Sequence, residues 1–110
     1  MPPAPLDLLR GTVDLLVLRT LAWEPMHGYA IAQFVRHRTD GAITIESAAL
    51  YQALHRLEKR KWVRAWWGLS ETNRRAKFYE LSAEGRKQLR SQSSDLRAYV
   101  TALYRVLDAR

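Results

Sequence analysis

The sequence predicts a mainly α-helical fold with one small β-hairpin, of the α+β class. Apolar residues recur at helical spacing in three segments of the first sixty residues. Two segments rich in aromatic and β-favouring residues follow, and they bracket a polar stretch. The last segment, from Ser82 to about Asp108, has no proline or glycine after Gly85 and is long enough for one extended helix.

The first two helices are predicted from apolar periodicity and from the residues that end them. Segment 6–23 has apolar side chains on nearly every turn and follows a proline-rich start. Glu24 and Pro25 end this helix, because proline excludes the preceding residue from helical geometry. A second, amphipathic helix is expected over 28–38, and the turn-forming segment 39–41 ends it.

The third helix, expected over 47–61, carries the surface most relevant to function. Ser47 is expected to cap it, and leucines at i, i+4 and i+7 form one apolar stripe. At 100° per residue, a row of polar and basic side chains lies opposite this stripe and on its shoulders. The candidate contact residues in this row are Tyr51, Gln52, His55, Arg56 and Lys59. The exposed face therefore offers hydrogen-bond donors, acceptors and positive charge.

A β-hairpin over 62–81 is predicted from the segments WVRAWWGL and AKFYEL. The tip and the returning strand carry polar and basic side chains, namely Asn73, Arg74, Arg75 and Lys77. Trp66 and Trp67 are adjacent in a strand and point to opposite faces, so the sequence leaves open which of them is exposed. The ordinary expectation for all four tryptophans is a place in the core or in packing contacts.

The last helix, expected within 82–110, predicts a homodimer. Ser82 is its expected cap, and leucines recur every seven residues, which is the spacing of a helix-helix seam. Such a helix has more apolar surface than one small domain covers, so pairing with a second copy is favoured over folding back as a lid. The interface residues expected from this helix are Leu89, Leu96, Tyr99, Val100, Leu103, Val106 and Leu107.

Positive charge is concentrated in one part of the chain. Segment 51–77 has eight Lys and Arg against two Glu, a net charge of +6, whereas the other 83 residues have a net charge of +1. A basic centre of this kind is typical of proteins that bind a phosphate backbone. The alternative is an ordinary solvated basic surface, in which Arg60, Lys61 and Arg64 simply suit the dipole at a helix end.

The order of elements, three helices followed by a hairpin, is that of a winged helix-turn-helix and predicts binding to double-stranded DNA through residues 1–81. In that arrangement the third helix enters the major groove. The residues expected to contact base edges are Gln52, His55 and Arg56, and those expected to meet phosphates are Tyr51, Lys59, Arg75 and Lys77. Arg74 at the wing tip is expected to enter an adjacent minor groove.

Other function classes find less support in the sequence. There is no cysteine, the histidines at 27, 37 and 55 form no motif, and no phosphate loop or paired carboxylates stand out. No catalytic residue, cofactor or metal site is therefore expected. Charges interrupt the N-terminal apolar run, so we expect no membrane span or signal peptide and a cytoplasmic location. The basic segment disfavours a protein-interaction module, and the narrow A-form major groove disfavours structured RNA.

Four segments taken together resemble the PadR family of transcriptional regulators: GTVDLLVLRTL, PMHGYAIAQ, ALYQALHRLEKR and ETNRRAKFYELSAEGRKQL. The short C-terminal part resembles the compact branch of the family, which has a single C-terminal helix. The resemblance implies a dimeric winged-helix protein, usually a repressor. It also implies that the first and last helices build the dimer, which adds Leu9 and Val13 to the expected interface. Many relatives respond to a small-molecule effector, and the sequence leaves open whether this chain has one.

The chain departs from the family pattern in the third helix. Ala48 and Ala49 stand where Gly-Ser is common before a Leu-Tyr pair, and Gln52 stands where proline is common after it. Gln52 can make two hydrogen bonds to adenine, so we expect a different operator preference. Lys61 occupies a position where glycine is frequent; if its backbone is left-handed, this costs about 1 kcal/mol.

Overall fold

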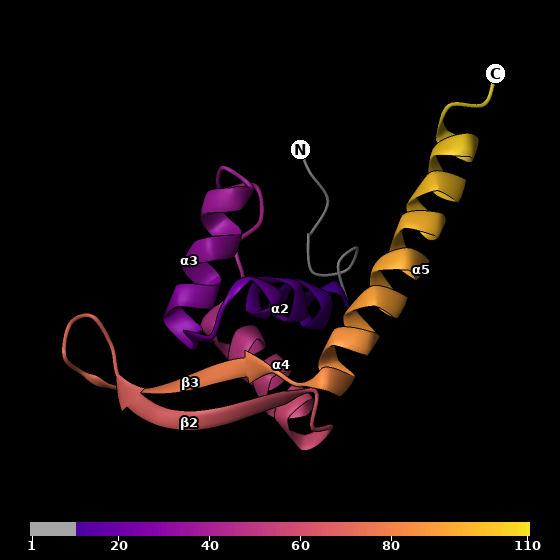
Figure 1. The fold of residues 1–110 in the computed structure, drawn as a ribbon. Helices are drawn as coiled ribbons and strands as arrows, with labels where there is room; N and C mark the ends of the chain where they lie inside the picture. The colour runs from indigo at the N-terminus through magenta and orange to yellow at the C-terminus, as the bar shows by residue number, and fades with distance from the viewer. Residues whose placement is uncertain (1–10) are drawn as a thin grey trace.

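The computed structural model describes residues 11–110 and confirms the α+β class, with helices packed on a small antiparallel sheet and a long C-terminal helix (Figure 1). The hairpin forms the wing of a winged helix-turn-helix. In chain order the elements are α2 (Thr12–Trp23), β1 (Met26–His27), α3 (Gly28–Arg38), α4 (Ser47–Lys59), β2 (Val63–Leu69), β3 (Arg75–Leu81) and α5 (Ala83–Leu107).

Helix α2 begins at Thr12, so the predicted helix is not continuous through Gly11, and its predicted start at residue 6 lies outside the described residues. Gly11 has a φ of 89°, a left-handed conformation that cannot continue a right-handed helix. The predicted interface residue Leu9 lies outside the described residues. At its other end the helix stops at Trp23 as predicted, because Glu24 adopts an extended conformation before proline.

The hydrophobic core lies where α2, α3, α4 and the sheet meet. The predicted stripe of α4 is confirmed, because Leu50, Leu54 and Leu57 are each at most 2% exposed. They form one cluster with Leu18 of α2, Ile31 of α3 and other buried residues. Burial of each such side chain contributes about 1.5–3 kcal/mol. The opposite face of α4 is therefore fixed toward solvent.

Helix α4 differs from the predicted helix 47–61 at both ends, because its cap lies one residue earlier than predicted and its last helical residue is Lys59. Ser47 is its first helical residue, and the cap position belongs to Glu46, which makes no capping hydrogen bond with its side chain. Beyond the helix end, Lys61 has a φ of 64°, so the left-handed conformation expected from the family pattern is present. A non-glycine residue there costs about 1 kcal/mol.

The sheet has the order β1-β3-β2, and β1 was not predicted. This strand is only two residues long and pairs antiparallel with β3, placing Met26 opposite Tyr79 and His27 opposite Phe78. The start of α3 is thereby attached to the middle of the hairpin. Residues 70–74 close the hairpin and are named the wing turn, in which Asn73 has a φ of 62°.

Three of the four tryptophans lie outside the core, although Trp66 and Trp67 make packing contacts, which were the other expected place for them. Trp23, Trp67 and Trp66 are 62%, 57% and 40% exposed, so both members of the adjacent pair face solvent. The wing turn extends past the helices, as Figure 1 shows. Each ring of the pair has a neighbour instead: Trp66 stacks on Phe78, and the Arg75 guanidinium lies over Trp67.

Helix α5 begins at the cap that was predicted and projects away from the rest of the molecule (Figure 1). The Ser82 Oγ accepts a hydrogen bond from the Gly85 amide at 3.0 Å. Leu89 packs against the core, whereas the last turns expose a row of apolar side chains. The division of the chain into a DNA-binding part, 1–81, and a dimerisation helix, 82–110, stays a prediction.

Candidate nucleic-acid interface

The outer face of α4 presents the side chains that periodicity placed there. Tyr51 is 52% exposed, and the other predicted contact residues of the helix are exposed as well. A shallow hollow of about 550 Å³ on this face is lined by Ala48, Tyr51, Gln52, His55 and Arg56. Four of the predicted contact residues therefore border one continuous surface.

Arg56 is held by a carboxylate that the sequence did not reveal. Its Nη2 donates to Oδ1 of Asp14 at 2.7 Å, and its Nε lies 3.4 Å from Oδ2. This hydrogen bond raises the pKa of Arg56. Arg60 lies at the edge of the same site, with its Nη1 4.0 Å from Asp14 Oδ2. Asp14 thus ties the basic side of α4 to α2.

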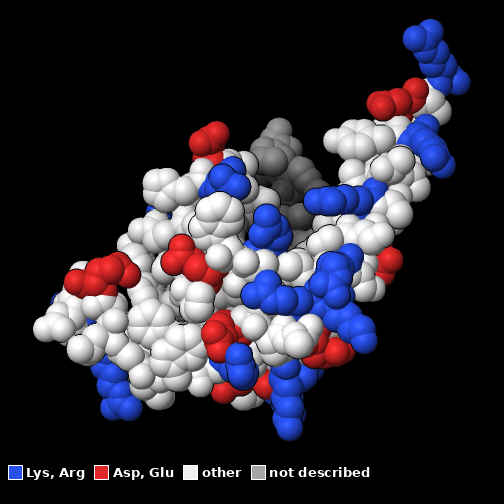
Figure 2. Space-filling model, in the orientation of Figure 1, with Lys and Arg blue, Asp and Glu red and all other residues white. Residues whose placement is uncertain are grey.

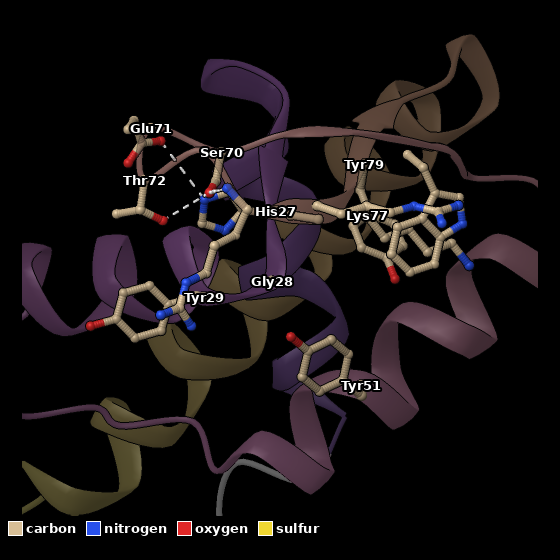
Figure 3. A pocket seen from close by; sticks show the side chains of 13 residues that line it. His27, Gly28, Tyr29, Tyr51, Ser70, Glu71, Thr72, Lys77 and Tyr79 are labelled. Carbon is tan, nitrogen blue, oxygen red and sulfur yellow. Dashed lines mark hydrogen bonds and ion pairs between the residues drawn. The ribbon is translucent and has the colours of Figure 1, made fainter.

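A groove of about 820 Å³ separates α4 from the wing. Figure 3 shows Tyr51 on one side, with its hydroxyl directed toward Gly28 at the start of α3. The Tyr51 side chain packs closely against the backbone of Gly28, because a Cβ at position 28 would lie only 2.7 Å from the Tyr51 Oη. Arg74, Arg75 and Lys77 line the opposite side of the groove. Predicted contact residues from two separate elements therefore face one channel.

The wing residues differ in how they are held. The Arg75 guanidinium lies 4.7 Å from the centre of the Trp67 ring, a cation–π contact that leaves its N–H groups available. Lys77 Nζ donates to Glu58 Oε1 at 3.1 Å, and this bond raises the pKa of Lys77. Lys77 therefore links the wing to α4 in addition to lining the groove.

Half of the cations in the basic segment 51–77 form ion pairs. Arg56, Arg60, Arg64 and Lys77 each pair with a carboxylate. Within residues 11–110, the cations of this segment that form no ion pair are Lys59, Lys61, Arg74 and Arg75. Figure 2 shows Lys and Arg atoms projecting along the lower edge of the molecule, where Figure 1 places β2 and α4. The uncompensated charge thus lies near α4 and the wing.

His27 caps α3 beside this groove, a role the sequence gave no sign of because helix caps are mostly Ser, Thr, Asp or Asn. Its Nδ1 accepts a hydrogen bond from the Ala30 amide at 3.2 Å. Because Nδ1 accepts this hydrogen bond, Nε2 is the ring nitrogen that carries the proton in this arrangement. Nε2 is buried, makes no hydrogen bond, and lies 3.8 Å from Glu71 Oε1 of the wing turn (Figure 3).

Residues 11–110 contain neither a metal-binding cluster nor a membrane-spanning helix. No cluster of three or more His, Asp or Glu side chains is arranged to hold a metal ion in this range. None of the described helices combines the length and the apolar character needed to cross a membrane.

Comparison with known proteins agrees with this geometry. Residues 17–91 match the family described as Transcriptional regulator PadR-like family. A transcriptional regulator from Clostridium thermocellum has a TM-score of 0.82 and 29% identity, covering 90% of this chain and 96% of that one. A PadR family regulator from Eggerthella lenta has a TM-score of 0.79 and 30% identity, covering 96% and 89%.

An uncharacterized protein of Lysinibacillus sphaericus is 31% identical over 83 residues, which is 76% of each chain. The matched family and the two solved relatives are transcriptional regulators and not enzymes.

Proposed function

The chain belongs to the PadR-like family of transcriptional regulators, and from this premise we propose that it is a repressor that binds a palindromic operator as a homodimer. Membership of the family implies regulation through DNA binding. The observation that carries the finer proposal is the groove between α4 and the wing, which is lined by Tyr51 of α4 and by the wing cations Arg74 and Arg75, neither of which forms an ion pair with the described residues. A duplex laid against this surface meets α4 and the wing together.

In this proposal α4 lies in the major groove and reads bases with Gln52 and His55. Both side chains are exposed on the face that borders the shallow hollow. Arg56 joins them when it exchanges Asp14 for an acceptor on DNA. The Arg56 side chain is 45% exposed and the Asp14 side chain 13%, so the exchange leaves a largely buried carboxylate, for which Arg60, with its Nη1 4.0 Å from Asp14 Oδ2, is the remaining partner.

Phosphate contacts hold the duplex in register. The groove is the proposed path of one DNA strand, with the Tyr51 hydroxyl on one side and Arg75 and Lys77 on the other. Lys59 meets the backbone from the end of α4. Asn73 and Arg74 at the wing turn reach an adjacent minor groove, where a narrow A·T-rich stretch attracts an arginine.

Helix α5 is the proposed dimer contact. Its last turns expose apolar side chains at spacings of three and four, which is the pattern of a helix-helix seam. The proposed seam residues on this helix are Leu96, Tyr99, Val100, Leu103, Val106 and Leu107. Val13 and Leu89 border the seam while also packing on the core of their own chain. Two-fold pairing of two winged helices matches a palindromic site.

Arg75 is assigned to a phosphate contact and Gln52 to a base contact, so substitution of each residue is expected to have a different effect on DNA binding. Arg75→Ala is expected to weaken binding to every duplex by a similar factor, about threefold to tenfold, and to lower the slope of log affinity against log salt by about one. Gln52→Ala is expected to change which base is preferred, because a bidentate base contact supplies about 1–3 kcal/mol of discrimination. Fluorescence anisotropy on an operator and its single-base variants measures both effects.

Arg19→Ala is the matched control, since Arg19 is an exposed cation on α2 outside the proposed contacts. It is expected to leave affinity and preference unchanged. A uniform loss of affinity in both Arg75→Ala and Gln52→Ala would show that the assignment of Gln52 to base reading is wrong.

A further inference from the structure

The face of the wing that borders the groove carries basic and aromatic side chains in close contact. Trp67 lies opposite Lys77 and Leu69 lies opposite Arg75, so all four side chains are on the same face of the hairpin. The Arg75 guanidinium lies 4.7 Å from the centre of the Trp67 ring, and the Lys77 Nζ lies 5.7 Å from that of Tyr79 (Figure 3). Each cation on this face therefore has an aromatic ring beside it.

Core packing does not explain the place of Trp67 on this face. The residue is 57% exposed and lines the groove. Within residues 11–110, it belongs neither to the buried cluster nor to the side chains packed against that cluster. The adjacent Trp66 lies on the opposite face and stacks on Phe78, with the ring centres 6.0 Å apart. The side-chain contact that distinguishes Trp67 is the one with the Arg75 guanidinium.

Arg75 and Lys77 are held by different kinds of partner. Lys77 donates to the Glu58 carboxylate at 3.1 Å, so a phosphate that approaches Lys77 also approaches a negative charge. Among the described residues Arg75 forms no ion pair, and its partner is a neutral ring. A cation–π contact uses the flat face of the guanidinium, whereas a phosphate accepts from the N–H groups at its edge. Arg75 can therefore bind a phosphate and keep its contact with Trp67.

We propose that Trp67 is a positioning residue for DNA binding, which holds the Arg75 guanidinium in place for a phosphate of the strand in the groove. This inference rests on the proposed function, in which the groove is the path of one DNA strand. A free arginine side chain has many rotamers and loses conformational entropy when it binds. The Trp67 ring restricts these rotamers before DNA arrives, so less entropy is lost on binding.

Binding to a fluorescein-labelled duplex of mixed sequence tests this role, because a phosphate contact does not depend on sequence. Trp67→Leu keeps an apolar side chain without a ring, and is expected to weaken binding about fourfold. Trp67→Phe keeps a ring and is expected to remain within about twofold of the wild type. In a chain that already carries Arg75→Ala, Trp67→Leu is expected to have no further effect, because no guanidinium remains to be held.

The contact between Trp67 and Arg75 is also measurable in the full chain without DNA. In spectra of the ¹⁵N-labelled protein, the Arg75 Nε–H resonance is assigned as the one that Arg75→Lys removes. The ring current of the Trp67 indole shifts protons above its face upfield. The Arg75 resonance is therefore expected to move downfield in Trp67→Leu and to stay close to its wild-type position in Trp67→Phe.

Trp66→Leu is the matched control, because Trp66 is the neighbouring exposed ring and is not part of the groove lining. It is expected to bind the duplex like the wild type. The positioning role would be overturned if Trp67→Leu bound like the wild type, if Trp66→Leu or Trp67→Phe lost as much affinity as Trp67→Leu, or if the losses of Trp67→Leu and Arg75→Ala added. Wild-type binding by Arg75→Ala would instead contradict the phosphate contact of the proposed function, and the positioning role with it.

Discussion

Gly85→Ala is expected to lower the free energy of unfolding by about 3 kcal/mol, because a methyl group at this position has no room. A Cβ on Gly85 would overlap the carbonyl oxygen of Trp62 and lie 2.9 Å from Leu81 Cδ1. That carbonyl cannot move freely, because it accepts hydrogen bonds from the Ser82 amide at 3.0 Å and the Ser82 Oγ at 2.9 Å. The glycine therefore fixes the close approach of α5 to the end of α4.

Urea denaturation followed by circular dichroism measures this loss. Gly68→Ala is the comparison variant, because a Cβ there meets the partly exposed Phe78 ring at 3.3 Å and Trp66 Nε1 at 3.8 Å, and no backbone atom within 3 Å. Its effect is expected to be well below that of Gly85→Ala. If Gly85→Ala unfolds at the same urea concentration as the wild type, the contact between Trp62 and α5 does not constrain the fold as described.

The combined variant Leu96→Ser and Leu103→Ser is expected to be monomeric, with half the mass of the proposed wild-type dimer in light scattering. Leu103 is 43% exposed in the single chain, so its replacement disturbs the proposed seam more than the core. Operator affinity is expected to fall at least about a hundredfold, because a monomer engages one half-site.

Ala98→Ser combined with Arg105→Ser is the matched control for the seam. Both positions are exposed and lie on the opposite side of α5 from the leucines, at 100° per residue. This variant is expected to keep the dimer mass and the operator affinity. A dimer mass for the leucine variant would count against the seam and would place the dimer contact elsewhere.

Local sequence patterns were sufficient to predict most of the helices and the hairpin. The leucines of α4 define one buried stripe, and helical geometry then places Gln52 and His55 toward solvent without further information. Ser82 was identifiable as a cap from its place before a long helix. Strand β1 was not identifiable, because two residues are too few for alternation and their pairing depends on Phe78 and Tyr79, far along the chain.

The electrostatics of the candidate interface were less predictable than its position. Charge counting located the basic segment, yet Arg56 pairs with Asp14, 42 residues earlier, and Lys77 with Glu58, 19 residues earlier. Such pairs depend on tertiary packing and have no signature in local sequence. The sequence also left open which of Trp66 and Trp67 is exposed, because the exposure of both depends on how the wing packs against the helices.

Selection of bound fragments from sheared genomic DNA of the protein's own organism, followed by sequencing, tests the central claim most directly. The account predicts that enriched fragments share a palindrome whose half-sites are centred about one or two turns of DNA apart, at about 10–10.5 base pairs per turn. Enrichment is also expected to decline steeply when the salt concentration of the binding step is raised. Recovery of fragments with no shared motif, or of an asymmetric motif lacking a second half-site, would contradict a homodimer that reads DNA through α4 and the wing.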